Sequence, residues 1–159
     1  MKTTTKSLPI SKEMVYEAWK QIRRNGGSAG VDAESLKDFE EDLSNNLYKL
    51  WNRLTSGSYF PQAVKQVGIP KASGGVRHLG IPTVSDRIAQ MVVKTSLEQR
   101  VDFMFSGNSF GYRPGKSAHM ALKQAVENCR KFDWVIDLDI KGFFDNIDHV
   151  LLEKALERH

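Results

Sequence analysis

The chain has 159 residues, of which 40% are hydrophobic and 26% charged, with a net charge of +4, a composition that is ordinary for a globular protein with one core. Its single cysteine, Cys129, excludes an internal disulfide framework and a multi-cysteine zinc site, and it is typical of a reducing cytoplasm. No apolar run is long enough to cross a bilayer, and the first ten residues lack the apolar core of a secretion signal, so we expect no membrane partner.

Two helices separated by a glycine-rich loop are predicted for the first third of the chain. Residues 11–24 carry apolar residues along one helical face, with Ser11 as the N-cap. The segment NGGSAGVD, residues 25–32, is predicted to be a loop, and a flexible connector is its simplest interpretation. One continuous helix is predicted for residues 35–56, ended by Gly57, because leucines recur there at three- or four-residue steps and form a core-packing stripe.

A β-hairpin and two further helices are predicted next. Residues 63–70 and 75–82 are rich in Val and Ile, and Ser73, Gly74 and Gly75 lie between them. A helix is expected at about 85–104, with Ser85 and Asp86 as its cap and first turn. After a loop at 106–115, Ser117 is expected to cap a helix to about residue 130, whose apolar face would pack Cys129.

The end of the chain predicts one strand and one helix. In WVIDLDI, residues 134–140, side chains would alternate between the two faces of a strand, with Trp134, Ile136, Leu138 and Ile140 toward a core. A helix is predicted for residues 148–158.

Charge is distributed unevenly along the chain. Residues 60–131 hold eleven lysines and arginines against four acidic residues, whereas residues 132–159 hold three against seven. A basic surface is what phosphate-binding proteins need, and carboxylates are what hard divalent cations need. Charge alone equally fits a solvated surface of uneven charge, which is the commoner case.

The acidic end contains one carboxylate that stands out. Asp137 and Asp139 would share a strand face about 6–7 Å apart, too far to chelate one ion directly without bending. We interpret Asp137 as facing solvent, and Asp145, Asp148 and His149 as turn, cap and helix-start residues. Asp139 remains a candidate metal ligand, because it ends a strand expected to be buried and precedes a glycine and two aromatic residues.

Two basic segments are candidates for phosphate contact. Lys71 and Arg77 flank the hairpin turn, and they would lie opposite each other on one face if the turn has five residues but not if it has four. They suit a triphosphate, although ordinary surface charge on an exposed hairpin is the alternative. The loop SGNSFGYRPGKSAH interleaves aromatic and basic residues, which favours base stacking with phosphate contact, and it lacks the Walker pattern of an NTPase.

Three segments together resemble one family. The runs QVGIPKASGGVRHLGIPTVSDRIAQ, FGYRPGKSAH and VIDLDIKGFFDNIDH are similar, in the same order, to consecutive blocks of bacterial group II intron reverse transcriptases. Upstream, GGSAGVD resembles the amino-terminal extension of that family, so the resemblance runs from about residue 20 to the end. It implies an α+β fold, with helical fingers and a β-hairpin in residues 1–131 and the beginning of the palm, including its first strand, in residues 132–159. It also implies a bacterial cytoplasmic protein.

The resemblance implies specific site residues. Asp139 matches the first catalytic aspartate, which binds both Mg²⁺ ions, and Ile140 would neighbour the metal through its backbone. Phe144 matches the aromatic residue that discriminates between nucleotides at the sugar 2′ position, with Phe143 as the neighbouring alternative. The residues implied to contact the incoming nucleotide are Lys71, Arg77, Phe144 and Arg113. The residues implied to contact RNA or template are Gly26, Gly27, Ser28, Lys65, Tyr112 and Lys116.

One departure from the family limits the expected activity. The Tyr-x-Asp-Asp hairpin that carries the second carboxylate pair does not occur in this sequence. We therefore expect an amino-terminal fragment that neither polymerises nor holds two Mg²⁺ ions stably by itself. RNA-templated DNA synthesis, with an RNA template, a DNA primer and dNTPs, would belong to the intact enzyme.

Other settings for the same segment stay open. It could instead be an RNA-binding maturase module that supports intron splicing without catalysis, or the same fold in a retron, diversity-generating or CRISPR-linked enzyme. We also expect apolar surface that would face the rest of the palm to be covered by self-association.

Overall fold

The computed structural model describes residues 9–72 and 74–158, which form two compact units. The first unit ends at Ser96 and the second begins at Leu97, so the division falls within a helix. The observed mixture of helices with one small antiparallel sheet agrees with the expected α+β class. The boundary between fingers and palm expected at residues 131 and 132 stays a prediction.

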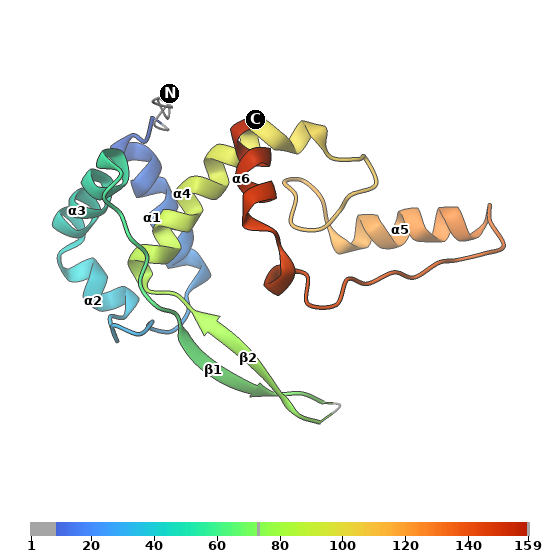
Figure 1. The fold of residues 1–159 in the computed structure, drawn as a ribbon, viewed down its shortest axis with the longest axis horizontal. Helices are drawn as coiled ribbons and strands as arrows, with labels where there is room; N and C mark the ends of the chain where they lie inside the picture. Colours follow the sequence, from blue (N-terminus) through green and yellow to red (C-terminus); the bar gives the residue numbers. More distant parts are fainter. Residues whose placement is uncertain (1–8, 73, 159) are drawn as a thin grey trace. The chain divides into compact units, whose positions relative to one another are not determined.

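The first unit packs helices around one apolar core. Its elements are α1 (Lys12–Asn25), α2 (Leu36–Glu41), α3 (Leu43–Ser56), β1 (Lys65–Pro70), β2 (Val76–Ile81) and most of α4 (Val84–Val101). At the centre of the core, the rings of Trp19 and Phe39 lie 5.2 Å apart between centroids. Figure 1 shows the β1–β2 hairpin projecting away from these helices. The residues that are buried in the core are Val15, Ala18, Trp19, Ile22, Phe39, Leu50, Val84, Ile88, Ala89 and Val92.

Helix α1 begins after the predicted cap and ends at Asn25, one residue later than the sequence predicts. The hydroxyl of Ser11 accepts the backbone N–H of Met14 at 3.2 Å, which satisfies one of the free donors at the helix start. Gly26 follows the last helical residue with a φ of 67°, a left-handed conformation that glycine adopts without steric cost.

The helix predicted as continuous over residues 35–56 is instead two helices, α2 and α3. Asp42 separates them with φ −120° and ψ 44°, outside the helical region. In an unbroken helix the carbonyl of Phe39 would accept the N–H of Leu43; here the side-chain amide of Asn46 donates to it at 3.1 Å. The break redirects the chain so that both Phe39 and Leu50 reach the core, which the leucine spacing alone could not reveal.

The predicted hairpin is confirmed, with an antiparallel register that runs from Lys65 opposite Ile81 to Pro70 opposite Val76. Five residues, 71–75, separate the last paired residues, and Ser73 among them lies outside the described residues. Gly74 and Gly75 have φ values of 88° and 84°. The turn therefore favours glycine at both positions, because a side chain would clash with the backbone in this left-handed region.

Helix α4 begins earlier than expected and is capped by a different residue. The hydroxyl of Thr83, not that of Ser85, accepts the backbone N–H of Asp86 at 3.1 Å. Asp86 lies in the first helical turn as predicted. The helix runs to Val101 and continues as the 3-10 turn η1 (Asp102–Met104).

The second unit corrects two expectations. After α5 (Ala118–Cys129), residues 134–140 form an extended segment (Figure 1) that pairs with no strand, so the predicted palm strand is wrong for this chain. A strand needs a partner edge, and the only sheet among residues 9–72 and 74–158 is β1–β2. The packed apolar face expected on α5 is likewise absent, because no α5 residue is buried and Cys129 is exposed.

Two short elements close the described chain. These are the 3-10 turn η2 (Phe144–Asn146) and α6 (His149–Arg158). As predicted, Asp148 is a cap, since its carboxylate accepts the N–H groups of Val150 and Leu151 at 2.8 and 3.1 Å. None of the helices within the described residues is long and apolar enough to span a membrane.

Candidate functional site

The hairpin displays its cations on one face. Residues paired across the two strands have their side chains on the same face of the hairpin, and side chains alternate between faces along each strand. Arg77 pairs with Ile69, which is four residues from Lys65 on β1, so Lys65 and Arg77 lie on the same face. The backbone N–H of Lys71 donates to the carbonyl of Gly75 at 3.0 Å, which continues the ladder by one position. All three cations are exposed.

Lys71 and Arg77 are diagonal neighbours on this face. Arg77 pairs with Ile69, two residues before Lys71, so the two cations do not lie directly opposite each other. The turn has five residues, and because side chains alternate along the strand, Lys71 and Arg77 lie on the same face of the hairpin. Diagonal positions of this kind are about 7–8 Å apart, a spacing that two phosphate groups of one ligand can bridge.

One buried carboxylate is hydrogen-bonded to both roots of the hairpin, meaning the segment that leads into β1 and the residues that follow β2. Asp86, 3% exposed, accepts hydrogen bonds from the hydroxyl of Tyr59 and from the backbone N–H of Gln62, both of which precede β1. It also accepts the hydroxyl of Thr83, which follows β2, at 2.8 Å. Burial, and then the bond to Asp86, raise the pKa of the Tyr59 hydroxyl, which therefore stays a donor at neutral pH.

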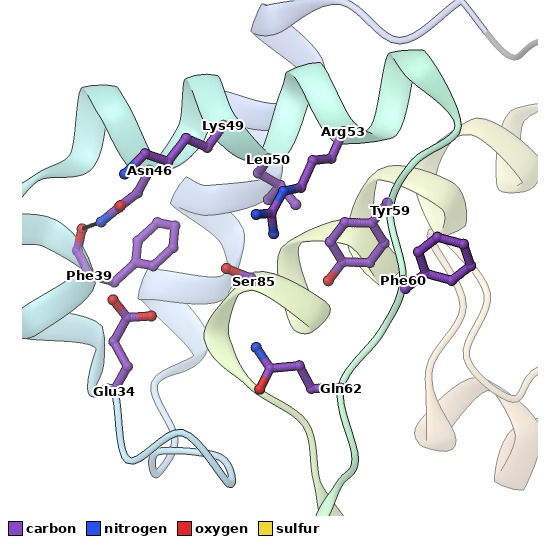
Figure 2. A pocket seen from close by; sticks show the side chains of 10 residues that line it. All are labelled: Glu34, Phe39, Asn46, Lys49, Leu50, Arg53, Tyr59, Phe60, Gln62 and Ser85. Atoms are coloured by element: carbon purple, nitrogen blue, oxygen red, sulfur yellow. Dashed lines mark hydrogen bonds between the residues drawn. The ribbon is translucent and has the colours of Figure 1, made fainter.

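A small polar pocket lies beside this root. It has a volume of about 130 Å³, and Figure 2 shows Arg53 from α3, Ser85 from α4 and Gln62 pointing toward one another inside it. Glu34 lines the opposite wall, where burial, and then the charges of Asp32 and Asp38, raise the pKa of its carboxyl group. The pocket is therefore lined both by the cationic side chains of Lys49 and Arg53 and by the carboxyl group of Glu34, whose raised pKa disfavours its charged form.

The glycine-rich loop, residues 25–32, is hydrogen-bonded to Arg87 of α4, so the flexible connector expected from the sequence is wrong. The guanidinium of Arg87 donates to the carbonyl of Gly26 at 3.2 Å and to that of Ser28 at 3.1 Å. A Cβ on Gly27 would lie 2.7 Å from this guanidinium, and one on Gly30 would lie 2.7 Å from the backbone of Thr83. Gly27 and Ser28 are exposed, so RNA contact by this loop remains a prediction.

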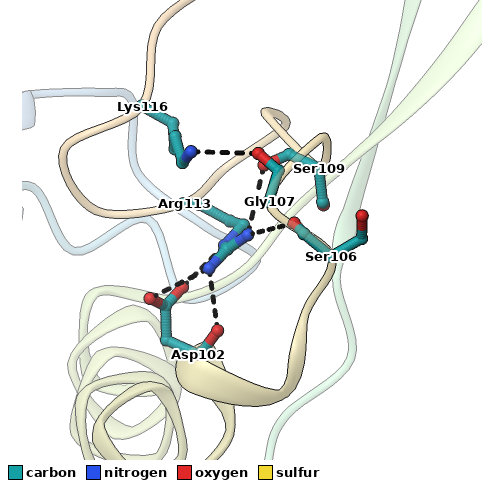
Figure 3. Close-up of polar contacts among 6 residues, drawn as sticks. All are labelled: Asp102, Ser106, Gly107, Ser109, Arg113 and Lys116. Carbon is teal, nitrogen blue, oxygen red and sulfur yellow. Dashed lines mark hydrogen bonds and ion pairs between the residues drawn. The ribbon is translucent and has the colours of Figure 1, made fainter.

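In the second unit, the loop between η1 and α5 is built around Arg113 (Figure 3). Its Nε donates to Asp102 Oδ1 at 2.8 Å, and its Nη2 donates to Asp102 Oδ2 at 3.2 Å and to the Asp102 carbonyl at 2.8 Å. Its Nη1 donates to the carbonyls of Ser106 and Ser109 at 2.8 and 3.2 Å. These bonds use all five guanidinium donors.

This arrangement bears on the role expected for Arg113. Its side chain is only 12% exposed, and a direct contact with a nucleotide would have to replace one of the five bonds. The nucleotide contact therefore stays a prediction. The bond from Arg113, and then the charges of Arg113 and Lys116, lower the pKa of the Asp102 carboxyl group, so the pair is ionised at neutral pH.

The same loop presents the ring of Tyr112 to solvent more fully than the ring of Phe105, which is 53% exposed. Tyr112 is fully exposed, and its backbone has a φ of 55°. Lys116 instead turns inward, since its ammonium donates to the carbonyl of Gly107 at 3.1 Å and lies 5.0 Å from the ring centre of Phe110. Of the two residues expected to contact RNA here, Tyr112 is thus the more accessible.

The acidic segment is exposed and extended. Asp137, Asp139 and Ile140 are all exposed, and Phe144 is 83% exposed with its ring 5.3 Å from that of Phe143. Among the described residues, no group of three or more histidines, cysteines and carboxylates lies close enough to hold a metal ion. Within residues 9–72 and 74–158, Asp139 is therefore not part of a cluster of three or more such ligands.

Four residues that organise these segments carried no functional prediction from the sequence. The sequence places Asp86 only in the first turn of α4 and predicts no role for Thr83, Arg87 or Asp102. A signal did exist for Arg87, because a glycine-rich loop leaves carbonyl groups that need donors from elsewhere in the chain. Nothing in the spacing identified Asp102 as the partner of Arg113.

The comparison with protein families decides the assignment. The pattern of the family described as "Reverse transcriptase (RNA-dependent DNA polymerase)" matches residues 69–159, which is more than half of the chain. The chain belongs to the reverse transcriptase family. The matched range contains Lys71, Arg77, Arg113 and Asp139, whereas the glycine-rich loop and Lys65 precede it.

Individual relatives include proteins named for the introns that encode them. The chain is 36% identical over 146 residues to the "Group II intron-encoded protein LtrA" of Lactococcus lactis subsp. cremoris, covering 90% of this chain and 24% of that protein. It is 36% identical over 134 residues to "Protein YkfC" of Escherichia coli strain K12, covering 81% and 35% of the two chains. It is also 31% identical over 157 residues to the "Putative COX1/OXI3 intron 1 protein" of Saccharomyces cerevisiae, covering 96% and 18%.

These similarities confirm the resemblance to group II intron proteins that the sequence motifs predicted. The chain spans 18% to 35% of the length of these three relatives.

Proposed function

We propose that this chain supplies the fingers and the start of the palm of an RNA-directed DNA polymerase of the group II intron type. Residues 1–131 would form the fingers and residues 132–159 the beginning of the palm. The observation that carries the proposal is the hairpin register, which places Lys65, Lys71 and Arg77 on one exposed face. Family membership supports it, because the matched range includes Lys71 and Arg77.

In this proposal the hairpin grips the triphosphate of an incoming dNTP. Arg77 can form a bidentate fork to one phosphate, and Lys71, diagonal to it, can act as a point charge on another. The carboxylate of Asp86 holds both roots of the hairpin, so the cations sit on an arm that is anchored at its base. Phe144, exposed in the second unit, would lie against the sugar and exclude a 2′ hydroxyl.

The proposed metal site centres on Asp139. Asp139 and Ile140 are exposed, and the Asp139 carboxylate and the Ile140 carbonyl could supply oxygen ligands. This fits Mg²⁺, because that ion takes one or two carboxylates together with substrate phosphates. When bound, two such ions would activate the primer 3′ hydroxyl and stabilise the leaving pyrophosphate. Because no cluster of three or more metal ligands surrounds Asp139 among the described residues, we propose that the chain would neither hold both ions stably nor polymerise by itself.

RNA contacts are proposed for each unit by itself, for the glycine-rich loop and hairpin of the first and for the Tyr112 loop of the second. A positively charged surface with accessible aromatic rings suits an RNA template or intron RNA, since phosphates and unstacked bases are the groups it would meet. A DNA primer would complete the substrate of the whole enzyme, and exposed apolar residues of the second unit would support self-association. The residues assigned to RNA or template are Gly26, Gly27, Ser28, Lys65, Tyr112 and Lys116.

Binding of a fluorescent dNTP analogue with Mg²⁺ tests the role of the hairpin. The variants are the double substitution Lys71→Ala/Arg77→Ala and, as a charge-matched control, Lys123→Ala/Arg130→Ala in and after α5. We expect the hairpin variant to weaken binding at least about tenfold, because each charge-assisted phosphate contact contributes roughly 1.5–3 kcal/mol. The control should bind within about twofold of wild type. Equal losses in both double variants would contradict the proposal.

A second candidate function is an RNA-binding maturase module without catalysis. The observation that favours it is the exposed Asp139, which has no carboxylate cluster around it among the described residues. Under this alternative, RNA binding persists in Asp139→Ala, and the hairpin variant loses no dNTP affinity beyond the control. Under the polymerase proposal, the hairpin variant loses dNTP affinity as stated above.

A further inference from the structure

The backbone of Tyr112 is held in a conformation that bulky residues rarely adopt. Its φ of 55° lies in the left-handed region, where a side chain crowds the backbone. Such a residue persists only when its surroundings over-determine its position. The adjacent Arg113 supplies that constraint, because its five hydrogen bonds fix the chain on the C-terminal side of Tyr112.

The loop closes on itself around the two cations. Arg113 ties Asp102 to the carbonyls of Ser106 and Ser109, so one side chain connects the start of the loop to its middle. Lys116 ties the far end back to Gly107 at 3.1 Å. Figure 3 shows both side chains converging on the same stretch of backbone.

The aromatic rings of the loop differ in what they do. Phe105 lies 5.4 Å from the Arg113 guanidinium and Phe110 lies 5.0 Å from the Lys116 ammonium, so both rings have cationic partners inside the loop. The Tyr112 ring is fully exposed to solvent. An exposed aromatic ring on a braced backbone is a surface on which an unpaired base can stack at little cost in ordering.

We propose that Arg113 is a positioning residue that holds the Tyr112 ring as a stacking platform for an unpaired base of single-stranded RNA. The inference rests on the proposed RNA-templated function and deepens it by separating two roles within one loop. Tyr112 contacts the base, whereas Arg113 acts through the backbone and does not touch the RNA. The planar five-donor fork is essential to this role, since a lysine at position 113 keeps the charge but offers only three donors from one point.

Binding of a single-stranded RNA that contains 2-aminopurine tests the proposal on the 159-residue chain. We compare wild type with Tyr112→Ala, Arg113→Lys and the double variant, and use Arg130→Lys as a control that makes the same exchange outside the loop. We expect Tyr112→Ala and Arg113→Lys each to weaken binding roughly 5- to 100-fold, as expected for one stacked base, and to reduce the quenching of 2-aminopurine. The double variant should bind no more weakly than Tyr112→Ala, because Arg113 acts through Tyr112.

A structural readout accompanies the affinities. Hydrogen–deuterium exchange in residues 105–116 should rise in Arg113→Lys, while exchange in α1 and α3 stays as in wild type. Additive losses in the double variant, unchanged exchange in the loop, or wild-type affinity in Arg113→Lys would each overturn the positioning role alone. A wild-type chain that binds no RNA at low salt would overturn both this inference and the proposed RNA-binding function.

Discussion

At the scale of single residues, the Asp86 carboxylate explains how a slender hairpin keeps a fixed base. It is buried without a cationic partner among the described contacts and is stabilised by neutral donors from both roots. A buried charge of this kind is tolerated only when its oxygens are hydrogen-bonded. Each donor to Asp86 should therefore contribute measurably to stability.

Removing the Tyr59 hydroxyl tests this arrangement. Tyr59→Phe keeps the ring and deletes one hydrogen bond to the buried carboxylate, so we expect a loss of about 1.5–3 kcal/mol in the free energy of unfolding. Tyr48→Phe is the matched control, because Tyr48 is 52% exposed and its change should cost less than about 0.5 kcal/mol. Urea denaturation measures both values, and equal values would contradict the role given to Asp86.

The Asp102–Arg113 pair predicts a pH dependence of the loop. In the folded chain the pKa of the Asp102 carboxyl group lies below its ordinary value of 3.8, chiefly because Arg113 donates to it. A depressed carboxyl pKa contributes stability that is fully present above the unfolded value and is lost as pH falls through the folded value. The Arg113 Nε–H resonance in NMR spectra should therefore stay constant from neutral pH down to about pH 5 and change only in the acid range below 3.8.

Asp102→Asn is the control for that measurement. It removes the titrating group, so the acid transition of the Arg113 resonance should disappear. A transition at neutral pH, or one that persists in Asp102→Asn, would show that another group governs the loop.

At the scale of elements, local signals predicted the helices well and tertiary contacts poorly. The caps at Ser11, Ser117 and Asp148 follow from short-range hydrogen bonding and are confirmed. The break at Asp42 depends on the core that Phe39 and Leu50 share, and the cap of α4 depends on Thr83, which also binds Asp86. Strand formation at residues 134–140 depends on a partner edge, which a segment cannot specify by its own alternation.

The packing of the glycine-rich loop on α4 gives a second stability prediction. A Cβ at position 30 would lie 2.7 Å from the backbone of Thr83, which cannot move aside as a flexible side chain could. We expect Gly30→Ala to destabilise the chain by about 1–3 kcal/mol, as overpacking of a close contact does. Gly107→Ala is the control, since nothing lies within 4 Å of its Cβ position. Thermal unfolding compares the two, and an unaffected Gly30→Ala would contradict the observed packing.

At the scale of the whole molecule, the sequence predicted the family and the secondary structure better than the site. Motif order identified a reverse transcriptase, and the match over residues 69–159 confirms it. The hairpin could be predicted, but its turn length was left open, and the direct opposition of Lys71 and Arg77 expected for a five-residue turn is wrong, since the two are diagonal neighbours. The support network of Asp86, Arg87 and Asp102 could not be predicted, because Tyr59, Gly26 and Arg113, which bond to these three residues in turn, lie 27, 61 and 11 positions away along the chain.

The exposed apolar segment predicts self-association. Trp134, Ile136 and Leu138 are 89%, 82% and 87% exposed, and contiguous apolar surface of this kind favours association in water. We expect light scattering to show a mass that rises with concentration, and Ile136→Lys/Leu138→Lys to lower it. The control Gln99→Lys/His119→Lys adds the same charges at exposed polar positions and should leave the mass unchanged. A monomer across all concentrations would contradict the prediction.

The measurement that tests the central claim most directly is binding of single-stranded RNA across a salt series. The account predicts that affinity falls steeply with salt, and that Lys65→Ala and Lys116→Ala each reduce the slope of log affinity against log salt by about 0.7, the value for one lost phosphate contact. Asp139→Ala should bind like wild type, because the proposed function assigns Asp139 to metal binding and not to RNA docking. Absence of binding at low salt, or a slope that neither lysine variant changes, would contradict the assignment of these residues to an RNA surface.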